Sequence, residues 1–365
     1  MSVRRFRLNK STLALSGLLL AVSGFSQELV RNSAKPLNPD AGRVLRLESV
    51  YEISDASGEF FFRFPSRFQL DRQGRLYMLD QDQLLQFSPQ GKFIRNFYKK
   101  GQGPGEIASR YQMISLVCFR DDVYVYDGRS KIIHFDGEGN LIGEVRQTAG
   151  QMFWLFGIAE GGYFMQGQTN APMGGAPGFR ENEIQAFLVS PDGTAREKIL
   201  GFTSRTFEGP GFGMNWDNYM QVFNPRDGSL YVSQTCEYKV VRADLFNRQI
   251  IVSFTRDYPR VKFHVPDSWK DFYKKYNPPK KDFENDISEL FVCGDKLWVK
   301  TSTTDKAKGA LFDVFDPRGR FLDSFYLPND MNLALADGDF IYVTEKDKDE
   351  NILFRKCRVL NRSED

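Results

Sequence analysis

Short apolar runs separated by turn residues dominate the stretch from Phe64 to Ile107. Turns at 71–74 and 88–91 place Pro and Gly where tight turns need them. The runs are too short for helices, and turns recur every eight to twelve residues or so, which predicts an antiparallel meander. Four strands of this kind in about 45 residues form one blade of a β-propeller.

The second strand of this unit recurs along the chain, each time after a tight turn. Most repeats also carry the turn between the third and fourth strands, as in Phe87-Ser-Pro-Gln-Gly91 and Phe315-Asp-Pro-Arg-Gly319. The second-strand anchors lie at 76–80, 123–127, 163–166, 230–234, 297–301 and 341–345. Six anchors predict an all-β chain with six four-stranded antiparallel blades.

The last repeat ends after its third strand, 354–360, and an unpaired strand at 43–53 is available as its fourth. Pairing the two removes exposed edges and closes the ring with the N-terminal strand. An open β-solenoid is the competing fold. The expected organisation is a linker at 27–42, one propeller at 43–360 and a tail at 361–365. The expected blades lie at about 64–107, 113–147, 153–200, 220–257, 286–327 and 331–360.

Residues 1–26 are typical of an export signal. Arg4, Arg5, Arg7 and Lys10 precede an apolar run at 13–22 that is too short to span a bilayer, and Gly24 and Ser26 fit cleavage before Gln27. No cysteine follows the run, which argues against a lipoprotein. The alternatives are an uncleaved anchor or a buried strand. We expect an exported protein, periplasmic or secreted, without membrane insertion after cleavage.

Charge and cysteine content exclude some partners and sites. Without the four basic residues of the signal, 45 basic side chains face 47 acidic ones, so nucleic acid is not an expected partner. Cys118, Cys236, Cys293 and Cys357 fall in different repeats, in or beside apolar runs. This favours buried thiols over disulfides or a metal site, although an exported protein is able to pair them.

The motifs resemble a known family. Leu76-Tyr-x-x-Asp80, Phe87-Ser-Pro-x-Gly-Lys-Phe93 and Gly101-Gln-Gly-Pro-Gly-Glu106 look like those of NHL-type six-bladed propellers. More narrowly, they resemble exported bacterial propellers whose first blade ends in Gly-x-Gly-Pro-Gly-Glu and whose N-terminal strand has a Leu-Glu pair, here Leu47-Glu48. The resemblance spans about 43–360, and it implies the fold rather than one activity.

Three long insertions fall in loops that a propeller places on one face. They are 166–184 within the third blade, 201–219 between blades three and four, and 257–286 between blades four and five. Long loops of this kind tend to be functional, so we expect the binding face there.

The third insertion carries a short helix from Trp269, capped by Asp267 or Ser268 and ended by Pro278-Pro279. Interleaved aromatic and lysine side chains suit an anionic or carbohydrate ligand, but they also suit a lid packed on the propeller with solvated lysines. The second insertion offers rings with amide and carboxylate neighbours, suited to sugar or peptide recognition or to a packed Ω-loop. The expected ligand-binding residues are Arg110, Tyr111, Arg180, Asn215, Trp216, Tyr219, Trp269 and Tyr273.

The glycines of 101–106 invite a phosphate-loop interpretation, but no Lys-Ser/Thr follows and no helix opens there. They are better explained as shaping the crossover between blades, with Arg110 and Tyr111 close to the ring axis.

Catalytic patterns are mostly missing. His134 and His264 are the only histidines, too few for a three-histidine metal site, and no G-x-S-x-G motif is present. Asp347, Asp349 and Asn351 match only the first half of a calcium loop. We therefore expect no cofactor, with Ca²⁺ left open through axial residues such as Glu289 and Gln221.

The sequence favours a non-catalytic binding propeller that recognises a glycan, a peptide or an envelope protein through its loop-rich face. The alternative is a metal-dependent hydrolase or lyase with its site at the axial channel.

Overall fold

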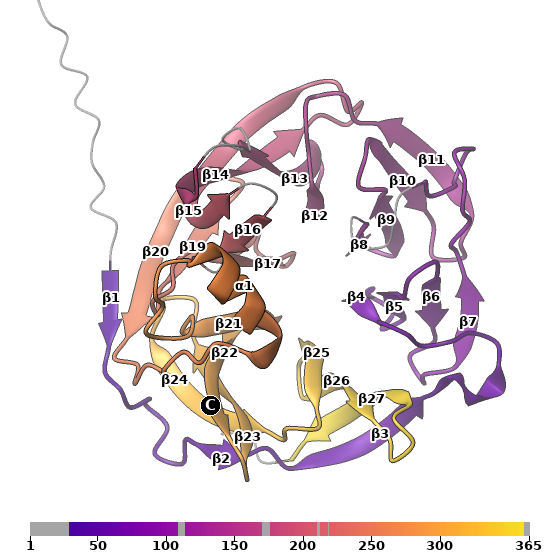
Figure 1. Ribbon diagram of the computed structural model, residues 1–365. Coiled ribbons are helices and arrows are strands. Elements are labelled where there is room, and N and C mark those ends of the chain that lie inside the picture. The colour runs from indigo at the N-terminus through magenta and orange to yellow at the C-terminus, as the bar shows by residue number, and fades with distance from the viewer. Residues whose placement is uncertain (1–28, 109–113, 170–175, 210–211, 218, 361–365) are drawn as a thin grey trace, which may run out of the picture.

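The computed structural model describes residues 29–108, 114–169, 176–209, 212–217 and 219–360. They form six sheets arranged in a ring (Figure 1). The innermost strands contact one another around the ring in the order β4, β8, β12, β17, β21 and β25, and β25 returns to β4. The predicted all-β, six-bladed propeller is confirmed. The predicted export signal lies outside the described residues.

Blades one and two are plain four-stranded meanders. Their turns are fixed by aspartates: Asp71 Oδ1 accepts hydrogen bonds from the amides of Gln73 and Arg75, and Asp136 Oδ1 does the same for Glu138 and Asn140. The strands are β4 (Ser66–Leu70), β5 (Leu76–Leu79), β6 (Leu84–Phe87), β7 (Phe93–Asn96), β8 (Ser115–Phe119), β9 (Asp122–Tyr126), β10 (Lys131–Phe135) and β11 (Leu141–Arg146).

Blades three, four and five are larger. Blade three has a fifth strand of its own, and blades four and five each gain one from the N-terminal segment. The strands are β12 (Trp154–Ala159), β13 (Gly162–Thr169), β14 (Gly178–Val189), β15 (Arg196–Gly209), β16 (Phe212–Asn215), β17 (Met220–Asn224), β18 (Ser229–Ser233), β19 (Val240–Asp244), β20 (Gln249–Arg256), β21 (Ile287–Cys293), β22 (Lys296–Asp305), β23 (Gly309–Phe315) and β24 (Phe321–Leu327).

Blade six closes the ring as expected. Its outer strand β3 (Leu47–Ile53) pairs antiparallel with β27 (Ile352–Val359), next to β26 (Phe340–Lys346) and β25 (Asn332–Asp337). A 3-10 turn, η1 (Asp55–Ser57), then leads to blade one. The expected closing strand, 43–53, is two strands: β2 (Arg43–Val44) pairs with blade five, and only β3 closes blade six.

The expected linker at 27–42 also contains a strand. β1 (Leu29–Asn32) adds parallel to β20 at the outer edge of blade four, and β2 adds parallel to β24 at the edge of blade five. We call residues 29–46 the strap. The strap lacks the alternation of apolar and polar residues that marks a strand in a sequence. β1 is stabilised instead by backbone hydrogen bonds to the exposed edge of blade four.

The core is divided among the junctions between blades. At each junction, a cluster of buried apolar side chains packs one blade against the next; Tyr77, Phe97 and Phe135 join blades one and two, for example. This arrangement accounts for the high Phe content, because large rings fill the space between pleated faces. Cys118, Cys293 and Cys357 are buried in these clusters and Cys236 is half-buried, and none of the four forms a disulfide.

Candidate functional site

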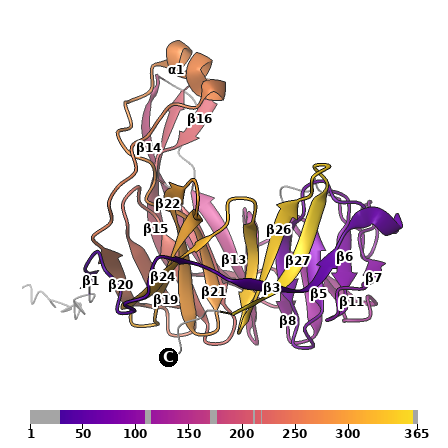
Figure 2. The ribbon, with the colours of Figure 1, turned by 90° about the horizontal axis from the view of Figure 1, so that it is seen from below.

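One part of the molecule rises well above the ring (Figure 2). It consists of the outer parts of β14 and β15, of β16, and of the segment that carries the helix α1 (Lys270–Tyr276). We call these parts, residues 178–183, 203–209, 212–217 and 263–281, the tower. The two blade-three insertions predicted as loops are therefore largely strand, and this prediction was wrong in secondary structure.

The sequence explains the extended hairpin. Residues 202–207 contain two Phe and two Thr, which are strong β formers, and cross-strand contacts continue to the end of the hairpin. Asn182 Nδ2 donates to Thr206 Oγ1 at 2.9 Å, and β16 then folds back on β15. Near the end of this hairpin, Gly209 pairs with Phe212 and Gly213 with Glu208.

The third insertion forms the other half of the tower. A 3-10 turn, η3 (Asp267–Trp269), leads into α1, and Asn277 ends the helix in the left-handed region before Pro278. The predicted helix is thus present, but neither Asp267 nor Ser268 caps it, because Trp269 already has helical backbone angles. At the base, Phe263 N–H donates to the carbonyl of Asp282, and Glu284 N–H to that of Val261, so the two arms of the insertion pair.

Aromatic rings connect the two halves. The ring centroid of Phe212 on β16 lies 4.1 Å from that of Tyr276 and 5.2 Å from that of Phe272, both on α1. We call the connected rings the aromatic stack: Phe179, Phe207, Phe212, Trp216, Trp269, Phe272 and Tyr276. Contacts of this kind hold α1 on the hairpin.

Two rings of the stack are exposed to solvent. Trp269 is 44% exposed and Phe179 is 43% exposed, whereas Phe207 is buried. These two rings are thus presented on a rigid base.

Charged groups brace the base of the tower. Arg205 binds the buried carboxylate of Asp217 through Nε–Oδ2 and Nη2–Oδ1 contacts of 2.9 and 3.1 Å. Lys281 Nζ donates to Asn285 Oδ1 at 2.7 Å and lies 5.7 Å from the centre of the Trp216 ring. Burial lowers the pKa of Lys281. These contacts fix Trp216 between hairpin and helix segment.

The tower contains five of the eight predicted ligand-binding residues. Trp216 and Trp269 belong to the aromatic stack, and Tyr273 lies against Phe272 and Phe263. Arg180, half-buried on β14, and Asn215, exposed on β16, both lie opposite Thr206 in the sheet.

The other three do not join this group. Tyr219 packs against the core between blades three and four and donates a 2.7 Å hydrogen bond to Gln221 Oε1. Burial raises the pKa of Tyr219, as expected for a phenol inside a core. Arg110 and Tyr111 lie outside the described residues.

The predicted ligand-binding residues include only Trp216 and Trp269 of the aromatic stack. Phe272 and Tyr276 are four residues apart, the spacing that places side chains on one face of a helix, so this signal was present in the sequence. Phe179, Phe207 and Phe212 were hidden because their strands were taken for loops.

The Gly-rich stretch 101–106 forms the crossover between blades one and two. Glu106 carboxylate accepts the N–H of Gly103 at 2.8 Å, and a Cβ on Gly101 would lie 1.9 Å from that carboxylate. From blade two, Glu144 accepts the N–H of Gly105 and Lys131 donates to the carbonyl of Gly103. These polar groups of the turn are thus hydrogen-bonded to other groups of the protein.

Among the described residues, no group of three or more His, Cys, Asp or Glu side chains is placed to hold a metal ion, as the metal-dependent alternative requires. Glu289 pairs with Lys300 at 2.7 Å, and His134 pairs with Asp122 at 2.8 Å. Asp347 accepts the amides of Asp349 and Asn351, so the half calcium loop is a hairpin turn.

The axis of the ring does contain a small cavity, of about 180 Å³. It is lined by residues of the inner strands of blades one to four, β4, β8, β12 and β17, and by Pro225. Gln221, which the sequence placed near the axis, lines it; Glu289 does not.

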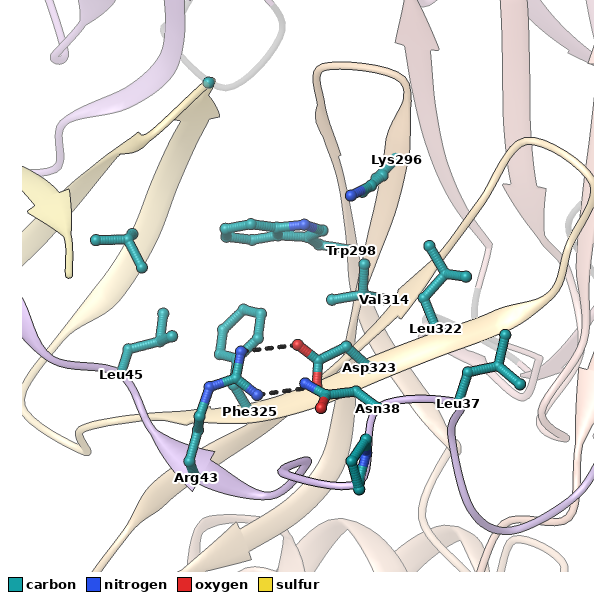
Figure 3. A pocket seen from close by; sticks show the side chains of 13 residues that line it. Leu37, Asn38, Arg43, Leu45, Lys296, Trp298, Val314, Leu322, Asp323 and Phe325 are labelled. Carbon is teal, nitrogen blue, oxygen red and sulfur yellow. Dashed lines mark hydrogen bonds and ion pairs between the residues drawn. The ribbon is translucent and has the colours of Figure 1, made fainter. Parts of the chain in front are cut away.

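A second cavity, of about 410 Å³, lies where the strap crosses blades five and six (Figure 3). Trp298, Phe325 and Leu45 form apolar walls. Asp323 accepts two hydrogen bonds from Arg43, at 2.9 and 2.8 Å, and one from Asn38 at 2.9 Å. The polar groups at this site therefore serve to anchor the strap.

The part of the chain that the structure describes has no helix with the length and apolar character needed to cross a membrane.

Comparisons with known proteins agree on the fold. A family model described as 6-bladed beta-propeller matches residues 62–158. A Bacteroides fragilis protein, described in its crystal structure as a putative exported protein, is 10% identical; the match covers 91% of this chain and 100% of that one, with a TM-score of 0.54. A member of the DUF4221 family from Bacteroides vulgatus is 11% identical over 88% of this chain and 99% of that one, with a TM-score of 0.55. A search of curated proteins finds no match. The chain is thus a six-bladed β-propeller, similar in fold to these two Bacteroides proteins.

Proposed function

We propose that the chain is an exported, non-catalytic binding protein that recognises a protein partner, presented as a peptide segment or a folded envelope protein, through its tower. The observation that carries this proposal is the exposure of two rings of the packed aromatic stack, Trp269 and Phe179. Exposed aromatic anchors on a rigid base are typical of the residues that dominate protein–protein binding energy.

The shape of the tower favours a protein over a glycan or a small molecule. Small ligands bind in concave sites, and neither of the two cavities described above is lined by tower residues. A projecting aromatic surface instead fits a recess in another protein. Recognition of a glycan, which the sequence analysis left open, is tested as an alternative result in the experiment below.

The charged side chains of the tower indicate which side chains surround the recess of a matching partner. Lys270 pairs with Asp267 within the tower, and Lys280 pairs with Asp282 directly after it. Lys274 and Lys275 occupy the last turn of α1, both exposed, and Lys275 lies 4.8 Å from the centre of the Tyr276 ring. A partner with acidic side chains around an apolar recess complements this surface.

The proposal has two further parts: the protein is exported, and it is related to the NHL-type propellers. The charged and apolar pattern of residues 1–26 supports cleavage before Gln27, and the 101–106 motif supports an NHL-type relationship. Mass spectrometry of the protein recovered from the periplasm or medium of an expressing bacterium tests the first point. A mature N-terminus at Gln27 is expected, and a retained Met1 would contradict export.

Parallel screens test the tower. Purified protein is applied to a phage-displayed peptide library and to a glycan array. The double variant Trp269→Ala/Phe179→Ala is compared with Phe64→Ala, which removes a 65% exposed ring outside the tower. We expect peptide hits that the double variant loses at least tenfold and Phe64→Ala keeps.

The other outcomes are also decisive. Glycan hits with the same sensitivity would replace the protein partner by a carbohydrate. Hits that survive the double variant, or no hits from either library, would overturn the assignment of the tower.

A further inference from the structure

The cavity under the strap is built on a bulge in blade five. Trp298 on β22 lies opposite Val314 on β23, which in turn lies opposite Asp323 on β24, so these three side chains share one face of the sheet. The pairing of β23 with β24 then shifts register and leaves Leu322 as an extra residue. Bulges of this kind re-aim side chains, so Leu322 and Asp323, although neighbours in sequence, both line the cavity.

The strap forms the facing wall, and backbone hydrogen bonds to β24 hold it there. The amides of Leu37, Asn38, Gly42 and Leu45 donate to carbonyls of that strand at 2.8 to 3.1 Å. The side chains of Leu37 and Leu45 line the cavity, and Val359 adds a wall from blade six (Figure 3). Leu37 is 69% exposed, which leaves the strap side open to solvent. The cavity is thus bounded by three separate parts of the chain.

The charged groups of the lining already have partners in the protein. The carboxylate of Asp323 accepts hydrogen bonds from the side chains of Asn38 and Arg43 and from the amide of Ser324. Lys296 also has an interaction within the protein. A carboxylate ligand would have to draw Arg43 away from the buried Asp323, and breaking such a pair is costly. The polar part of the lining therefore favours an uncharged ligand.

The rest of the lining is mostly apolar and contains two rings. Trp298 and Phe325 are buried and meet edge to face, with ring centroids 4.9 Å apart. A planar ring packs well on such a pair, because aromatic rings favour edge-to-face and offset-stacked contacts. An apolar cavity of about 150 Å³ holds benzene, so the cavity of about 410 Å³ has room for a larger, fused-ring body.

We propose that this cavity binds a small, uncharged aromatic ligand of the size of a fused ring pair, packed against Trp298 and Phe325 and covered by the strap. Burial of such a ligand removes apolar surface of the strap, blade five and blade six from water together. The ligand then ties the strap to both blades, so binding is expected to make the strap more stable. This site is separate from the tower, so neither proposal depends on the other.

Isothermal titration calorimetry with indole and quinoline tests this site. The comparison is indoleacetate, which carries the indole body together with a negative charge. We expect both neutral probes to bind, and indoleacetate to bind at least tenfold more weakly than indole. Hydrogen exchange reports the location: the amides of Leu37, Asn38, Gly42 and Leu45 are expected to exchange at least roughly threefold more slowly with indole bound.

Two variants fill the cavity. Val314→Phe and Leu322→Trp each place a ring in this space, and both are expected to weaken indole binding at least tenfold. The matched control is Val222→Phe, which fills the axial cavity instead and is expected to leave indole binding unchanged. Circular dichroism establishes that each variant is folded. Leu322→Trp, at a half-buried position, carries the test if Val314→Phe is not.

Four results would overturn the proposal. One is the absence of binding by both neutral probes. The second is indole binding that persists in both filling variants, or that is lost equally in Val222→Phe. The third is tighter binding of indoleacetate than of indole, which would make this a site for organic anions. The fourth is unchanged exchange of the strap's amides, which would place indole elsewhere.

A variant that ends at Leu360 completes the test, because Val359 lines the cavity and residues 361–365 lie outside the described residues. We expect it to bind indole as the full chain does. Binding to this variant alone would show that the full chain does not accept the ligand, and would contradict the proposal.

Discussion

The guanidinium Nε of Arg256 lies 2.8 Å from Oδ2 of Asp313, and both side chains are almost completely buried between blades four and five. Tyr238 donates its hydroxyl to the same carboxylate oxygen at 2.7 Å, while the other oxygen, Oδ1, has no hydrogen-bond partner among the described residues. The rings of Tyr238, Tyr258 and Phe321 surround the guanidinium. This ion pair is therefore held in a nearly dry site.

That burial predicts a pH-dependent stability. Burial raises the pKa of Asp313 to about 6 despite the attraction of Arg256. A carboxyl with a raised folded-state pKa stabilises the fold fully below its unfolded pKa, near 4, and loses that contribution as the pH rises through 6. Replacing Arg256 by Met raises the pKa further and leaves an unpaired buried charge. We expect a loss of about 3–5 kcal/mol at pH 8 and clearly less at pH 5.

Urea unfolding at the two pH values measures the difference. The control is Arg320→Met, which removes a more exposed ion pair with Asp316 and is expected to cost less than about 1 kcal/mol at either pH. An equal loss at pH 5 and pH 8 for Arg256→Met would show that Asp313 does not titrate in this range.

The strap predicts a second effect. Asn32 Nδ2 donates to the carbonyls of Thr255 and Gly319, and its Oδ1 accepts the N–H of Phe321. Asn32→Ala removes all three hydrogen bonds at the junction of blades four and five, so we expect a loss of about 2–3 kcal/mol in unfolding free energy. Asn247→Ala, which removes one exposed hydrogen bond to Asp244, is the matched control. Similar losses in both variants would contradict a structural role of the strap.

Ring closure predicts a contrast between two glycines in left-handed turns. Gly91 has a φ of 78°, and a Cβ there would lie 2.5 Å from the ring of Tyr51 on the closing strand; Gly294 has a φ of 66° with open space around it. Gly294→Ala is expected to lose about 1 kcal/mol of unfolding free energy, because only the left-handed backbone is unfavourable for Ala. Ala at Gly91 also displaces Tyr51, for a total of about 2–4 kcal/mol. Chemical denaturation compares them, and equal losses would mean that β3 accommodates the extra atom.

The tower predicts a local effect. Phe212→Ala removes the ring that contacts both Phe272 and Tyr276, so α1 is expected to exchange its amide hydrogens at least about tenfold faster, while the propeller keeps its melting temperature. Phe179→Ala removes a tower ring that does not touch α1 and serves as control. Unchanged exchange in Phe212→Ala would show that α1 is held by other contacts.

The blades could be predicted from sequence because each one repeats a local signal. Asp71 and Gly74 fix a turn within four residues, and such turns recur in register with short apolar strands. The prediction of a helix near Trp269 succeeded for the same reason, since the prolines Pro278 and Pro279 that end it are a local signal. Its cap was wrong because the 3-10 turn η3 shifts the helix start to Lys270.

What the sequence could not predict depends on distant partners. β1 has no pattern of its own and exists because the edge of β20 is available. In the sequence, the hairpin of blade three has the glycine content of a loop. Its extended structure depends on the packing of Phe212 on α1, which is distant in the sequence. Arg67 resembles any surface arginine in the sequence, because its contact with Trp154 arises only when the ring brings the inner strands of blades one and three together.

The strap also sets an order for folding. Asn32 lies 287 residues before Gly319, with which it pairs, and β1 joins a strand made more than 200 residues later. Since the N-terminal part of a chain emerges first from the ribosome or the export channel, this segment waits unpaired until most of the molecule exists. Contacts over such long sequence separations are slow to form, so ring closure is expected to be a late and rate-limiting event. A chain interrupted before blade four leaves the strap without its strand partners.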